Sequence, residues 1–89
     1  MTLSAVQPNN MALYHYDSCP FCAKTRHAID ELELSIELRN IQKNHQHRIE
    51  LQQGGNKTQV PCLRIEQANG KAQWLYESDD IINFLHSRK

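Results

Sequence analysis

Two cysteines, Cys19 and Cys22, stand two residues apart in the stretch YDSCPFCAK, residues 16–24. Two thiols at this spacing can ligate a metal ion, form a structural disulfide or exchange electrons as a redox pair. A short apolar and aromatic run, residues 12–16, precedes them and is typical of a buried strand, whereas Pro20 suits the first turn of a helix. A CxxC motif between a strand and a helix favours thiol–disulfide chemistry.

The position of the motif predicts different roles for the two thiols. At the start of the helix, the Cys19 sulfur would face unpaired backbone N–H groups and the positive end of the helix dipole, which favour thiolate over thiol. Cys22 would lie one turn further on, more shielded but able to attack a mixed disulfide on Cys19. We therefore predict that Cys19 is the nucleophile and Cys22 the resolving thiol. The negative charge of Asp17 would oppose the thiolate if it lay close.

The other two uses of a CxxC motif fit this chain less well. A structural zinc site needs four ligands, and the candidates to join the two cysteines are His15, His27 and Cys62. Because His15 falls in the expected strand, this set is not expected to close, and no metal is predicted. Three cysteines in 89 residues also do not form the dense disulfide framework of a small secreted domain. Cys62 itself is expected to be a small buried residue.

The composition is that of an ordinary globular chain, with 39% hydrophobic and 22% charged residues. A formal net charge of zero argues against nucleic acid or an anionic membrane as the main partner. No segment approaches the ~18–20 apolar residues of a membrane-spanning helix. The N-terminus lacks the basic and apolar segments of a secretory signal. We expect a cytoplasmic protein with a flexible lead-in, residues 1–10, and a single domain, residues 11–89.

Hydrophobic periodicity and turn residues predict the element order βαβαββα. A strand–helix–strand unit makes the first two strands parallel, and a hairpin turning at Asn69-Gly70 adds an antiparallel pair. The expected fold is therefore α/β, with a four-stranded mixed sheet flanked by helices. Strands are expected at residues 12–16, 36–41, 62–66 and 73–76, and helices at residues 20–34, at residues 43–53 and from residue 78 onward.

Individual residues predict how some of these helices begin, end and face solvent. Gly54 and Gly55 are expected to stop the second helix, and Ser78 is expected to cap the last one. Lys24 and Arg26 are assigned to the solvated face of the first helix.

Three motifs occur in order across residues 11–87, namely Cys19-Pro20-Phe21-Cys22, Gln59-Val60-Pro61 and Glu77-Ser78-Asp79. Together they resemble the glutaredoxins and the thioredoxin-fold N-terminal domain of glutathione transferases. The resemblance implies a thioredoxin-like fold, a cis Val60–Pro61 peptide bond and glutathione as co-substrate.

The resemblance also implies how glutathione would bind. The backbone of Val60, next to Pro61, would pair with the cysteinyl unit, and Ser78 at a helix N-terminus would hold the γ-glutamyl carboxylate. Glu77 or Asp79 would receive the ammonium group of the same unit. The glycyl carboxylate would bind Lys57 or Gln59.

Together these features predict a monomeric, glutathione-dependent thiol–disulfide oxidoreductase that reduces protein–glutathione mixed disulfides or small disulfides. Two alternatives remain open. One is an iron–sulfur cluster carrier, a dimer that holds a [2Fe–2S] cluster through Cys19 and glutathione. The other is a non-catalytic glutathione-binding module. Conjugation of glutathione to a second substrate is not expected, because that activity needs a C-terminal helical domain and the chain ends at Lys89.

Overall fold

A computed structural model describes residues 10–88, so residues 1–9 of the expected lead-in lie outside the described residues. Its elements follow the predicted order. They are β1 (Met11–His15), α1 (Pro20–Glu31), β2 (Glu37–Asn40), α2 (His45–Gly55), β3 (Cys62–Glu66), β4 (Ala72–Tyr76) and α3 (Ser78–Arg88). The sheet has the strand order β2-β1-β3-β4; β1 and β2 are parallel, and the other neighbouring pairs are antiparallel. The predicted four-stranded mixed sheet is confirmed.

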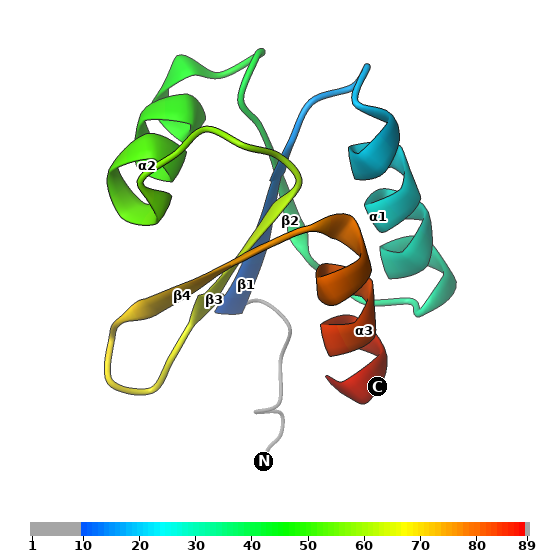
Figure 1. Cartoon of the computed structure of the whole chain (residues 1–89). Helices are drawn as coiled ribbons and strands as arrows, with labels where there is room; N and C mark the ends of the chain where they lie inside the picture. Colours follow the sequence, from blue (N-terminus) through cyan, green and yellow to red (C-terminus); the bar gives the residue numbers. More distant parts are fainter. Residues whose placement is uncertain (1–9, 89) are drawn as a thin grey trace.

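The helices divide between the two faces of the sheet (Figure 1). Helices α1 and α3 pack against each other on one face, and α2 lies against the other. Alternate residues of β1 point to opposite faces, so Leu13 joins the core under α1 and α3 while Tyr14 joins the cluster under α2. The first core contains Met11, Leu13, Ile29, Ile36, Leu63, Ile65, Ile81 and Leu85. The second contains Tyr14, Ile41, Leu51 and Cys62.

Strand β1 is central and buried along its whole length, because it has a strand on each side and helices on both faces. The chain leaves it at His15 and enters α1 at Pro20. The CxxC motif therefore follows the most completely buried strand of the described residues. Among residues 10–88, no helix has the length and apolar character needed to cross a membrane.

Helix α1 ends at Glu31, three residues before the expected end. The Leu34 N–H bonds to the Ile29 carbonyl at 3.2 Å, and the Glu33 N–H bonds to the Asp30 carbonyl at 3.0 Å. Glu33 takes a positive φ of 57°. This is the hydrogen-bond pattern of a Schellman motif, in which glycine usually holds the left-handed position. Because glutamate stands there instead, the sequence carries no glycine signal for this helix end.

The prediction that Gly54 and Gly55 stop α2 was wrong, since both lie inside the helix. A Cβ atom on Gly54 would overlap the ring of Trp74, and one on Gly55 would overlap the hydroxyl of Tyr76. The glycines therefore let α2 approach β4 closely. The helix ends at Gly55 and is capped by Asn56, which adopts φ 68° and whose N–H bonds to the Gln52 carbonyl at 3.0 Å.

The turn between β3 and β4 matches the predicted Asn-Gly hairpin. The Gly70 N–H bonds to the Gln67 carbonyl at 2.9 Å, and the Gln67 N–H bonds to the Lys71 carbonyl at 2.8 Å. Gly70 supplies the positive φ, 84°, that this short connection requires. Strand β3 has the predicted bounds, and the remaining strands and α2 differ from expectation by one or two residues at their ends.

Candidate active site

Cys19 occupies the N-cap of α1, where its sulfur meets a backbone donor. The residue has an extended conformation, φ −81° and ψ 115°, and its Sγ accepts a hydrogen bond from the Cys22 N–H at 3.2 Å. The Cys19 carbonyl accepts the first helical bond, from the Ala23 N–H at 3.0 Å. A negative charge on this sulfur would therefore interact favourably with a donor and with the helix dipole.

Cys22 lies one helical turn further on and is more deeply buried. The exposed fractions are 5% for Cys19 and 0% for Cys22, and neither cysteine is in a disulfide. Burial raises the pKa of the Cys22 thiol well above its usual range, and the hydrogen bond with Cys19 raises it further. At neutral pH Cys22 is therefore a protonated thiol. That Cys19 reacts first and Cys22 second stays a prediction.

A groove of about 260 Å³ opens beside the CxxC motif. Phe21, the residue between the cysteines, forms part of its wall and is 62% exposed. The Val60–Pro61 peptide bond is cis, as the resemblance implied. All of the predicted glutathione-binding residues except Lys57 line the groove, namely Gln59, Val60, Pro61, Glu77, Ser78 and Asp79.

The polar side of the groove is the start of α3. The expected capping residue was Ser78, but the Glu77 carbonyl accepts the first helical bond, from the Ile81 N–H at 3.0 Å. Glu77 is therefore the N-cap, in a left-handed conformation with φ 73°, and Ser78 is the first helical residue. The backbone N–H groups of this first turn have no partner within the helix. The Glu77 carboxylate accepts a hydrogen bond from Gln59 Nε2 at 3.2 Å.

Lys24 lies on the solvated face of α1, as expected, and its ammonium group also reaches the start of α3. Its Nζ lies 2.6 Å from Asp79 Oδ1, which links α1 to α3. Lys57, in contrast, lies away from the groove lining, with its ammonium group 4.3 Å from the centre of the Tyr76 ring.

The negative charge of Asp17, which precedes the cysteines, is paired with the positive charge of Lys43. Its carboxylate lies 3.0 Å from Lys43 Nζ and accepts a hydrogen bond from Asn40 Nδ2 at 3.3 Å. The hydrogen bond with Lys43 holds the pKa of the Asp17 carboxyl below its usual value. Both side chains are exposed, and their opposite charges offset each other near the motif.

Arg26 is the residue of this site that sequence reasoning missed. Its guanidinium turns back toward the motif, 3.0 Å from His15 Nδ1 and 3.4 Å from the Tyr16 carbonyl oxygen. The expectation of a solvated side chain was therefore wrong. Arg26 lies seven residues after Cys19, a spacing that returns to the same helix face, and this spacing was the signal available in the sequence.

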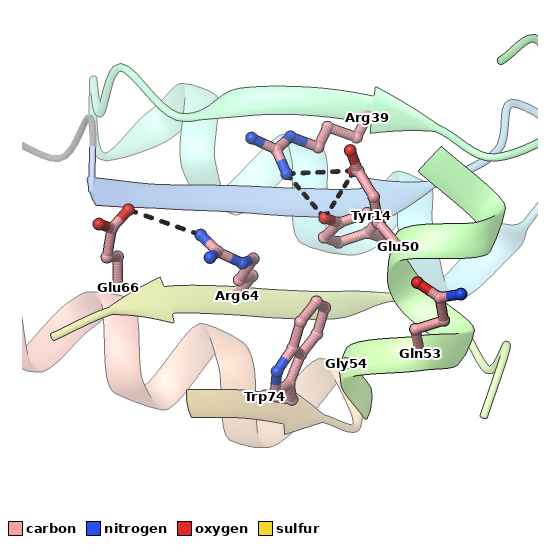
Figure 2. A pocket seen from close by; sticks show the side chains of 8 residues that line it. All are labelled: Tyr14, Arg39, Glu50, Gln53, Gly54, Arg64, Glu66 and Trp74. Atoms are coloured by element: carbon pink, nitrogen blue, oxygen red, sulfur yellow. Dashed lines mark hydrogen bonds and ion pairs between the residues drawn. The ribbon is translucent and has the colours of Figure 1, made fainter. Parts of the chain in front are cut away.

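A larger hollow of about 560 Å³ lies on the α2 side of the sheet, with side chains from all four strands and from α2 (Figure 2). Tyr14 donates a hydrogen bond to Glu50 Oε1 at 3.0 Å and accepts one from Arg39 at 2.7 Å. Arg64 lies 3.7 Å from Glu66. These charges offset one another within the hollow. Among residues 10–88, no three His, Cys, Asp or Glu side chains are grouped to hold a metal ion.

Comparison with known families places this site in context. A family model described as the glutathione S-transferase N-terminal domain matches residues 13–89. The chain belongs to the glutathione S-transferase N-terminal domain family. No curated protein matches the sequence.

Solved structures show the fold of this family member independently. Glutaredoxin 2 from Salmonella typhimurium, in complex with glutathione, is 28% identical with a TM-score of 0.66, over 86% of this chain and 33% of its own. Maleylacetoacetate isomerase from Anaeromyxobacter dehalogenans, with bound dicarboxyethyl glutathione, is 24% identical with a TM-score of 0.67, over 92% and 38%. A thioredoxin-like protein is 16% identical with a TM-score of 0.66, over 84% and 97%. The fold is thioredoxin-like, and the chain spans less than two fifths of the first two proteins.

Proposed function

We propose that this glutathione S-transferase N-terminal domain is a glutathione-dependent thiol–disulfide oxidoreductase. The observation that carries the proposal is the Cys19 sulfur at the N-terminus of α1, hydrogen-bonded to the Cys22 N–H and adjacent in sequence to a wall of the groove. Glutaredoxin 2, which is 28% identical over most of this chain, was solved in complex with glutathione, and this supports glutathione as the ligand.

In the proposed binding mode the groove holds glutathione in an extended conformation. The Val60 backbone, next to the cis-Pro61 bond, pairs with the cysteinyl unit. The first backbone N–H groups of α3, at Ser78 and Asp79, bind the γ-glutamyl carboxylate, and Glu77 binds the ammonium group. The glycyl carboxylate is bound by Gln59 or, after it leaves the Tyr76 ring, by Lys57.

In the proposed reaction, the Cys19 thiolate attacks the glutathionyl sulfur of a mixed disulfide. The old S–S bond breaks, the substrate sulfur leaves as a thiolate that takes a proton from water, and Cys19 is left bound to glutathione. A second glutathione thiolate then attacks the glutathionyl sulfur, which releases oxidised glutathione and the Cys19 thiolate. One glutathione thiol is the reductant, the other half of the oxidised glutathione comes from the substrate, and the substrate disulfide is the species reduced.

Cys22 offers a second way to complete the cycle. Its sulfur attacks Cys19, releases glutathione and leaves a Cys19–Cys22 disulfide, which two further glutathiones reduce. Because burial raises the pKa of Cys22, this thiol must lose a proton before it attacks. We therefore propose that release by glutathione carries most of the turnover. We also propose a monomer as the working form and the reducing cytoplasm as its compartment.

The proposal is tested by reduction of a glutathionylated peptide, coupled to glutathione reductase and NADPH. We expect Cys19→Ser to abolish activity and Cys22→Ser to retain most of it. Cys62→Ser is the matched control, because Cys62 is a buried thiol that does not line the groove, and it should retain activity. Full activity in the Cys19→Ser variant, or none in the wild type, would refute the proposal.

Membership in the glutathione S-transferase N-terminal domain family favours one second candidate, the transfer of glutathione to an electrophile. The same preparations distinguish the two functions. A domain that conjugates glutathione to 1-chloro-2,4-dinitrobenzene but does not reduce the glutathionylated peptide is a transferase domain rather than an oxidoreductase.

A further inference from the structure

We infer that Tyr76 is a positioning residue of the proposed glutathione groove, because its side chain holds the connection between α2 and β3, residues 56–61, in place. The inference rests on the proposed function, since this connection carries Lys57 and Gln59, the residues proposed to bind the glycyl carboxylate. Tyr76 is the last residue of β4 and does not itself line the groove. It therefore acts through the residues that it holds.

The connection has few backbone hydrogen bonds of its own. The N–H of Asn56 caps α2, and residues 57–60 form no backbone–backbone hydrogen bond within the described part of the chain. Tyr76 supplies contacts from outside. Its hydroxyl donates a hydrogen bond to the Gly55 carbonyl at 3.1 Å and lies 3.5 Å from the Lys57 carbonyl oxygen. The ammonium group of Lys57 lies over the face of the Tyr76 ring, 4.3 Å from its centre.

The far end of the connection is tied to the same part of β4. Gln59 Nε2 donates a hydrogen bond to the carboxylate of Glu77, the residue that follows Tyr76 and begins the α3 side of the groove. Cys62, the first residue of β3, is the cross-strand partner of Tyr76 in the register. Two consecutive residues at the end of β4 therefore fix the connection relative to the start of α3.

Gly55 gains a role from this contact, although it does not end α2 as the sequence suggested. A Cβ atom at this position would overlap the Tyr76 hydroxyl. The absence of a side chain on Gly55 is therefore what lets the hydroxyl reach the carbonyl of the last helical turn. The contact depends on both residues, and each offers a separate way to break it.

A connection that is already ordered lowers the entropy cost of binding, because the ligand does not have to fix it. Lys57 and Gln59 lie on the stretch that Tyr76 holds. Val60 instead precedes Pro61, which is buried at the start of β3, and the γ-glutamyl end is proposed to bind α3. Loss of the Tyr76 hydroxyl should therefore weaken the binding of the glycyl end of glutathione and not of the rest.

The test is calorimetric titration with two ligands that cannot form disulfides, S-methylglutathione and S-methyl-γ-glutamylcysteine, which lacks the glycine. We expect Tyr76→Phe, which keeps the ring, to lower the affinity for S-methylglutathione about fivefold, as for loss of one hydrogen bond. Its affinity for S-methyl-γ-glutamylcysteine should stay within about twofold of the wild type. Gly55→Ala, which keeps the hydroxyl but displaces it, should show the same selective loss.

Tyr14→Phe is the matched control. Tyr14 is the other cross-strand partner of Cys62, and its hydroxyl also has two polar partners, Glu50 and Arg39, neither of which belongs to the connection. Both affinities should stay within about twofold of the wild type. An unchanged affinity of Tyr76→Phe for S-methylglutathione, or an equal loss for the two ligands, would overturn the inference.

A second measurement needs no ligand and separates this inference from the proposed function. Backbone order parameters from ¹⁵N relaxation should be about 0.85 at residues 57–59 in the wild type and in Tyr14→Phe, and below about 0.6 in Tyr76→Phe. Equal order parameters in all three proteins contradict the inference. If the wild type binds neither ligand, the glutathione-binding part of the proposed function fails, and the order parameters alone decide whether Tyr76 holds the connection.

Discussion

The surroundings of the third cysteine, Cys62, predict how the free energy of unfolding changes at alkaline pH. Its side chain is completely buried on β3, between Tyr14 of β1 and Tyr76 of β4 in the strand register. Burial raises the pKa of the Cys62 thiol from 9.0 to about 12, although the Tyr76 hydroxyl and the Lys57 charge act in the opposite direction. The folded state therefore holds the proton of Cys62 more tightly than the unfolded state does.

The sign and size of the effect follow from proton linkage. Because the folded pKa lies above the unfolded one, the stabilisation is complete below pH 9 and is lost as the pH rises toward 12. The loss in the free energy of unfolding due to Cys62 is about 1 kcal/mol at pH 10 and about 3 kcal/mol at pH 11. The upper limit, for a shift of about three pKa units, is about 4 kcal/mol.

The assay compares the wild type with Cys62→Ala in urea, with a phosphine reductant, at pH 8, 10 and 11. Alanine leaves a small cavity, which lowers stability by an amount that does not depend on pH. We expect the wild type to lose about 3 kcal/mol more than Cys62→Ala between pH 8 and pH 11. Parallel pH dependences for the two proteins would refute the reasoning, since they would mean that Cys62 ionises equally well in both states.

Two further predictions concern backbone geometry. Gly54→Ala places a methyl group in the Trp74 ring and should cost about 1–3 kcal/mol of stability in urea denaturation, in spite of the higher helix propensity of alanine; unchanged stability would mean that the ring moves aside without cost. Glu77 adopts a left-handed conformation, φ 73°, which is strained for a residue with a Cβ atom. Glu77→Gly removes this strain and should raise the free energy of unfolding by up to about 1 kcal/mol. The same substitution should weaken glutathione binding measured by calorimetry, and tighter or equal binding would contradict the proposed role of the carboxylate.

Much of the fold could be predicted because its signals are local in the sequence. The bounds of β3 and the hairpin turn at Gly70 follow from a short apolar run and an Asn-Gly pair. The end of α1 could not be predicted in this way, because Glu33 occupies the left-handed position in which glycine usually stands. Gly54 and Gly55 misled the prediction for a related reason, since their function depends on β4, which lies about twenty residues further along the chain.

The sequence by itself determined which residues we propose as the carriers of the chemistry. Cys19 and Cys22 are separated by only two residues and lie at a strand-to-helix junction, so their placement follows from local structure. The distant motifs that begin at Gln59 and Glu77 were associated with them through the resemblance. The tertiary structure brings both motifs to one groove, at which Phe21 also lies.

Only the tertiary structure decided which charges act on the thiols. Asp17, which precedes the motif, is paired with Lys43 from the β2–α2 connection. Arg26, which looked like a solvated helix residue, contacts His15 and the peptide between the strand and the cysteines. The physical reason is that an ion pair or a buried hydrogen bond depends on distance in space and on shared burial, and neither quantity is encoded in the spacing of residues along the chain.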